Sequence, residues 1–145
     1  MREPSPPPPA PRGRNIPVGY WLPAMVWVCI MFLLSSLPDP ETLLGRSIMS
    51  LGDALLHSGG FAVLAVLVSR VAFSLGGGSG LRPLGWALLC CAGYGLVDEL
   101  HQILIPGRGF AWTDWLADVG GALVGGALLW VVGGLVERRR GRGRS

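Results

Sequence analysis

The chain has 145 residues, of which 50% are hydrophobic and only 14% are charged. An ordinary soluble domain carries about 25% charged residues. Two long stretches, residues 15–38 and 119–136, contain no charge at all, and uncharged apolar stretches of about 20 residues are typical of membrane-spanning helices. The composition therefore excludes a soluble enzyme, a DNA-binding domain and a disulfide-stabilised domain, and the length allows about four spans.

The chain divides into a proline-rich start, a membrane domain and an arginine-rich end. Residues 1–17 hold seven of the twelve prolines and are predicted to be disordered, because such a segment has no core to bury. Residues 18–136 form the predicted membrane domain, and residues 137–145 form a tail with five arginines. The predicted spans cover residues 18–37, 54–75, 84–105 and 115–136. They predict an all-α, polytopic membrane protein built as a four-helix bundle.

The arginines predict the orientation of this bundle. Four spans put both ends of the chain on one side of the membrane, and ten of the twelve basic residues, all of them arginine, then lie on that side. Only Arg46 and Arg108 lie on the other side. Because arginine is retained on the cytoplasmic side, we expect both termini to be cytoplasmic. The tail is interpreted as a topology anchor that attracts anionic lipid headgroups, and not as a nucleic-acid-binding segment.

Seven of the nine acidic residues fall in or near the outer half of the predicted bundle. On helices, residues four apart share a face, which groups Asp53 with His57, Asp98 with Gln102 and Asp114 with Asp118. A carboxylate inside the bilayer costs at least a few kcal/mol, so these groups are expected to face the bundle interior. We therefore predict one outward-facing polar pocket. Its candidate ligand-binding residues are Asp53, His57, Asp98, Glu99, Gln102, Arg108, Asp114 and Asp118.

Each of these residues also has a simpler interpretation. Asp53 and Asp114 are placed to cap helices, Glu99 to point out towards the membrane surface, and Asp98 to pair with Arg108 across a tight Pro-Gly-Arg-Gly turn. No catalytic, cofactor or metal-binding motif is recognised, since one histidine with scattered carboxylates has no known metal spacing. Small residues spaced by four in 117–126 predict close helix contact, within the bundle or in a homo-oligomer formed through the fourth span.

The sequence of residues 97–114, V-D-E-L-H-Q-I-L-I-P-G-R-G-F-A-W-T-D, followed by a glycine-rich span, resembles the signature of VanZ-like membrane proteins. The earlier D-A-L-L-H at residues 53–57 is similar to the D-K-x-x-H of that family, and the resemblance extends roughly over residues 33–129. Three positions depart from it. Ala54 replaces a lysine, Ser58 replaces an aromatic residue, and Asp118 stands where asparagine is common.

The resemblance implies a multi-pass protein of the bacterial cytoplasmic membrane. The family takes its name from a member linked to teicoplanin resistance, so we expect a site that binds a cell-envelope lipid or a cell-wall precursor headgroup and modulates glycopeptide susceptibility. Arg108 would hold an anionic group, because guanidinium suits phosphate geometrically. Two alternatives stay open. One is a membrane-embedded hydrolase or transferase with Asp98 or Glu99 as general base, and the other is a structural assembly subunit.

Overall fold

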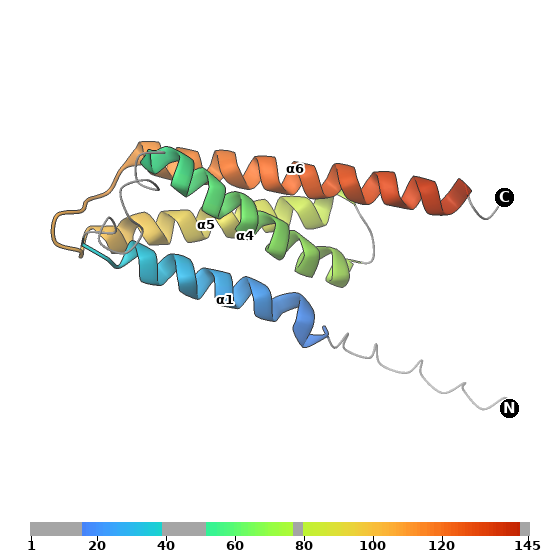
Figure 1. Cartoon of the computed structure of the whole chain (residues 1–145), viewed down its shortest axis with the longest axis horizontal. Coiled ribbons are helices and arrows are strands. Elements are labelled where there is room, and N and C mark those ends of the chain that lie inside the picture. The colour runs from blue at the N-terminus through green and yellow to red at the C-terminus, as the bar shows by residue number, and fades with distance from the viewer. Residues whose placement is uncertain (1–15, 39–51, 77–79, 143–145) are drawn as a thin grey trace, which may run out of the picture.

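The computed structural model describes residues 16–38, 52–76 and 80–142, and within these ranges the chain forms helices and no strand. The helices are α1 (Val18–Ser35), α4 (Asp53–Gly76), α5 (Leu81–Gln102) and α6 (Trp112–Arg142), as Figure 1 shows. The predicted all-α bundle of four helices is confirmed. Most of the proline-rich segment predicted to be disordered, residues 1–15, lies outside the described residues.

Three of the helices are long and apolar enough to cross a membrane, over Val18–Ser35, Ala54–Leu75 and Trp112–Val136. Helix α5 is less apolar than these three stretches, because it ends in the polar residues from Asp98 to Gln102. At 1.5 Å per residue, α6 is about 46 Å long, whereas the hydrocarbon core of a bilayer is about 30 Å thick. Because α6 continues to Arg142, the predicted tail begins as an extension of the last span.

The helices lie side by side along one long axis (Figure 1). The beginning of α1 and the end of α6 are found at the same end of the bundle, as an even number of membrane crossings requires. Helix α4 contacts each of the other three helices, and its contact with α6 is the most extensive. The assignment of this end to the cytoplasm stays a prediction.

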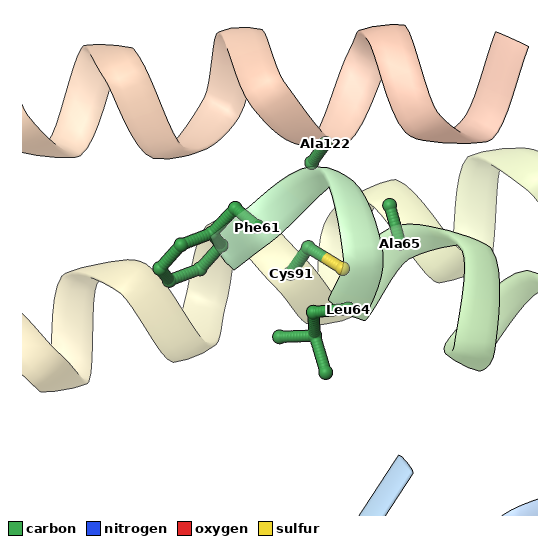
Figure 2. Close-up of a cluster of buried hydrophobic side chains, with 5 residues drawn as sticks. All are labelled: Phe61, Leu64, Ala65, Cys91 and Ala122. Atoms are coloured by element: carbon green, nitrogen blue, oxygen red, sulfur yellow. The ribbon is translucent and has the colours of Figure 1, made fainter. Parts of the chain in front are cut away.

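The apolar core is small and lies where α4, α5 and α6 meet (Figure 2). Its fully buried members are Phe61, Leu64, Ala65, Cys91 and Ala122. Many larger apolar side chains point outward instead, and Leu104, for example, is 76% exposed. Such a surface is favourable only in an apolar surrounding, which agrees with a bundle embedded in lipid.

Small residues on α6 allow its close contact with α4. A Cβ atom at Gly121 would collide with the backbone of Ser58, and one at Gly125 would collide with the backbone of Ala62. The predicted role of these glycines in helix contact is confirmed within the bundle. A homo-oligomer formed through the fourth span stays a prediction.

We expect Gly121→Ala to lower the free energy of unfolding by about 2 kcal/mol, because the added methyl group must push two backbones apart. Gly120→Ala is the matched control, since a Cβ atom there meets nothing within 4 Å. The midpoint of thermal unfolding in detergent measures both variants. Equal midpoints for the two would contradict the close contact of α4 with α6.

Candidate functional site

Helices α4 and α6 begin, and α5 ends, at the end of the bundle opposite the start of α1 (Figure 1). Polar side chains of these three helices lie in their segments at this end. Glu99 and Asp118 are 0% exposed, Gln102 is 4% exposed and Asp98 is 6% exposed. These carboxylates are therefore held inside the bundle and not at its surface. We call the following six residues the polar cluster: His57, Asp98, Glu99, Gln102, Asp114 and Asp118.

His57 and Asp118 form a hydrogen-bonded pair within the cluster. Nδ1 of His57 on α4 donates a hydrogen bond to Oδ1 of Asp118 on α6, over 3.0 Å. The bond leaves Nε2 as the remaining nitrogen of the imidazole ring. A buried carboxylate on Nδ1 fixes the orientation of the ring and stabilises its protonated form, as in catalytic and metal-binding histidines.

Glu99 links α5 to the start of α6. Its Oε2 atom accepts a hydrogen bond from the backbone N–H of Ala111 over 2.7 Å, directly before the first residue of α6. In a capping box a glutamate of the same helix bonds the N–H at this position, and here a neighbouring helix supplies the carboxylate. The alternative in which Glu99 points away from the bundle is wrong, because the residue is fully buried.

Several carboxylate oxygens of the cluster have no hydrogen-bond donor. Nε2 of Gln102 donates to Oδ2 of Asp98 over 3.3 Å. Oδ1 of Asp98, Oε1 of Glu99 and Oδ2 of Asp118 are buried and find no partner among the described residues. Buried polar atoms are nearly always satisfied in native proteins, so these three oxygens make this end of the bundle the candidate site.

The segment between α5 and α6 contains a tight turn that carries Arg108. The N–H of Arg108 donates to the carbonyl oxygen of Ile105 over 3.1 Å, and Gly107 between them has a φ of 83°. With Pro106 before that glycine, these are the features of a type II turn. The Arg108 side chain donates to the carbonyl oxygen of Ser35 over 3.3 Å, at the end of α1. A cation is favourable at this end of a helix.

Arg108 therefore ties the turn to α1. It forms no ion pair with Asp98 within the described part of the chain, so the structural Asp98–Arg108 pair considered from the sequence is wrong. The binding of an anionic group by Arg108 stays a prediction.

Gly95 makes room for Asp118. A Cβ atom at this position of α5 would lie 3.0 Å from Oδ2 of Asp118 and 3.3 Å from the ring of Phe61. A side chain here would have to displace Asp118 or Phe61 by a few tenths of an ångström, so glycine favours the close approach of this carboxylate to α5. The spacing of the acidic residues gave no sign of this contact, because Gly95 shares no motif with Asp118.

The sequence also did not predict the contacts that α1 and the aromatic residues make with neighbouring helices. Oγ of Ser36 and Nε2 of His101 lie 3.1 Å apart, and the ring of Phe32 lies 4.7 Å from that of His101. Trp115 donates its indole N–H to the carbonyl oxygen of Ala92. Bonds of this kind hold helices together in lipid, but no residue pattern identifies their acceptors.

The residues predicted from the sequence are largely brought together. Ligand atoms of His57, Glu99 and Asp114 lie within 4.8 Å of one another, and Asp118 is bonded to the first of them. Asp53 is the first residue of α4, but its side chain lies outside the described residues. The sequence showed no metal-ligand spacing because these three residues come from three different helices.

The sequence profile of the VanZ/LLP1 family matches residues 20–133, most of the chain and all of the polar cluster. The chain belongs to the VanZ/LLP1 family. The expected resemblance to VanZ-like proteins is thereby confirmed. No curated protein and no solved structure was found to match the VanZ/LLP1 chain.

We expect Glu99→Ala to lower the free energy of unfolding by about 2 kcal/mol, because it leaves the Ala111 N–H buried without an acceptor. Glu99→Gln keeps an oxygen at this place and should retain most of the stability. Thermal unfolding of the purified protein, followed by circular dichroism, compares the two. If both variants unfold at the same temperature, the bond to Ala111 does not stabilise the start of α6.

Proposed function

We propose that the polar cluster binds the headgroup of a cell-envelope lipid or cell-wall precursor, and that this binding modulates susceptibility to glycopeptides of the teicoplanin type. One observation carries the proposal. Three buried carboxylates, those of Asp98, Glu99 and Asp118, each keep an oxygen without a donor at one end of the bundle. A headgroup rich in hydroxyl or amine donors would satisfy them.

The surroundings of the cluster favour an amphiphilic ligand. Large apolar side chains are exposed next to the cluster in the sequence, namely Leu100 in the last turn of α5 and Ile103 and Leu104 directly after this helix. Apolar side chains of this kind suit acyl or isoprenoid chains, while the carboxylates suit the polar headgroup. A lipid therefore fits the site better than a small water-soluble ligand does, since its two parts match two neighbouring surfaces.

The proposal is consistent with a membrane protein that carries only a short turn between α5 and α6. The turn contributes Arg108, whose guanidinium bonds the end of α1. A phosphate in the headgroup would offer this guanidinium a stronger, charge-assisted hydrogen bond than the carbonyl of Ser35 does. Headgroup binding would then be accompanied by a local change at the end of α1.

We expect Asp98→Asn to lower the amount of lipid retained by the purified protein by about tenfold, because the loss of a charge-assisted hydrogen bond costs about 1.5–3 kcal/mol. Asparagine still accepts the hydrogen bond of Gln102, so the helix end should persist. Mass spectrometry of the protein purified in mild detergent identifies and quantifies the lipid.

The control variant Glu137→Gln removes the same charge near the other end of α6 and should leave retention unchanged. The same variants, expressed at equal membrane levels, are compared for glycopeptide susceptibility. Equal lipid retention and equal susceptibility of Asp98→Asn and the unaltered protein would refute the proposal.

A second function, a membrane-embedded hydrolase or transferase acting on lipid-linked substrates, is favoured by the bond between His57 and Asp118. A carboxylate that orients a histidine is the arrangement used for general acid–base catalysis. In this reaction His57 would take a proton from the attacking water or hydroxyl group, and Asp118 would stabilise the charged ring. The same headgroup contacts would position the substrate.

If the protein is such an enzyme, Asp118→Asn should lower its turnover of envelope lipid at least about 100-fold, in the range typical for loss of acid–base catalysis. Lipid retention should fall much less. Products are followed by mass spectrometry after incubation with a total lipid extract. The absence of any product with the unaltered protein would leave binding as the function of the site.

A further inference from the structure

We propose that His57, Glu99 and Asp114 bind one divalent metal ion, with zinc as the best match, and that Asp118 orients the histidine for it. Each of the three residues offers one ligand atom, and these atoms lie within 4.8 Å of one another. The site joins the beginning of α4, the end of α5 and the beginning of α6. It goes beyond the binding of a headgroup, because metal binding requires no lipid.

The ligand atoms suit a metal ion that is borderline between hard and soft, such as zinc. One imidazole nitrogen and two carboxylate oxygens are ligands that zinc accepts, and ligands of a tetrahedral zinc ion lie about 3.4 Å apart at bond lengths near 2.1 Å. Side-chain rotations that move the ligand atoms by about 1 Å would bring them from within 4.8 Å of one another to this tetrahedral spacing. Three protein ligands leave a coordination position for water or for a ligand oxygen, which is the pattern of functional and not of purely structural zinc sites.

Asp118 supplies the support that metal-binding histidines normally have. Because Nδ1 of His57 donates to Oδ1 of Asp118, the lone pair of the neutral ring lies on Nε2 and is free to bind a metal ion. Carboxylate–histidine–metal arrangements fix the tautomer and strengthen the ligand in this way.

Glu99 gives an independent sign that a hydrogen-bond donor or metal ion is missing from the site. The residue is 0% exposed, and its Oε2 atom accepts a hydrogen bond from the N–H of Ala111. The other oxygen, Oε1, is buried with no partner among the described residues. The carboxylate is thus anchored by one oxygen while the other stays free, as in a ligand that is positioned before its ion arrives.

The charges of the site also favour a bound cation. Three carboxylates lie at His57: ligand atoms of Glu99 and Asp114 lie within 4.8 Å of it and of each other, and Asp118 is bonded to it. The guanidinium of Arg108 bonds the end of α1. In an apolar surrounding several carboxylates without enough positive charge are costly, and one divalent ion would offset this charge directly.

Metal binding is tested on the full chain in detergent, after removal of any purification tag and treatment with a chelator. The stripped protein is mixed with Zn²⁺, passed through a gel-filtration column and analysed for metal per chain. We expect about one zinc ion per chain and a higher unfolding temperature in its presence, since a ligand that binds only the folded state stabilises it. Substitution by Co²⁺ reports nitrogen and oxygen coordination through its visible absorption.

The variants His57→Gln, Glu99→Gln and Asp114→Asn should each weaken zinc binding by more than about 100-fold, and Asp118→Asn by about 10–100-fold, the loss typical of a residue that supports a ligand. His101→Gln and Glu137→Gln are the matched controls. His101 is the other histidine of the chain, and its Nε2 lies beside Oγ of Ser36 instead.

The proposal is overturned if the stripped, folded protein retains no zinc, or if His57→Gln and His101→Gln bind it equally. Circular dichroism verifies that each variant is helical. If a variant does not fold, the zinc content and Co²⁺ absorption of the unaltered protein still decide the matter. Lipid retention is measured separately in chelator-treated protein, so its loss or persistence tests the headgroup proposal independently of the metal.

Discussion

The structure depends on one constraint: carboxylates placed at membrane depth must find their partners inside the bundle. The bundle meets it by burying Glu99 and Asp118 fully, while large apolar side chains of the helices, such as Leu128 on α6, are exposed. Protein partners satisfy only part of this demand. The Ala111 N–H serves one oxygen of Glu99, and His57 serves one oxygen of Asp118. The remaining oxygens are what makes this end of the bundle a candidate site and not just a joint between helices.

Helix contact and site geometry depend on the same glycines. Gly121 and Gly125 bring α6 against the backbone of α4, and Gly95 brings α5 close to Asp118. Together these contacts set the three helices that carry the polar cluster at fixed distances. A site built from rigid helices is more exactly shaped than one built from loops. The glycines that look like pure packing in the sequence therefore also determine the spacing of the functional side chains.

The sequence was sufficient for the number of helices, their approximate bounds and most of the polar cluster. Uncharged stretches of the right length predict spans directly, and residues four apart on a helix predict a shared face. The contacts between helices could not be predicted in this way. One such contact is the hydrogen bond from the Ala111 N–H to Glu99, and another is the close spacing of Glu99, Asp114 and His57. Both depend on how three helices are rotated and shifted against each other. That arrangement follows from close backbone contacts, which leave no periodic pattern.

The attachment of α1 has a consequence for how this helix can evolve. Tyr94 donates to the carbonyl oxygen of Val28, and Arg108 donates to the carbonyl oxygen of Ser35. Every residue type carries a carbonyl, so these two anchors do not depend on which side chains α1 presents. Mutations that alter the lipid-facing residues of α1 would keep both bonds. The lipid-facing positions of α1 can thus vary with the lipid composition of the host, whereas Trp27, which donates its indole N–H to the carbonyl oxygen of Gly60, is an anchor that does depend on a side chain of α1.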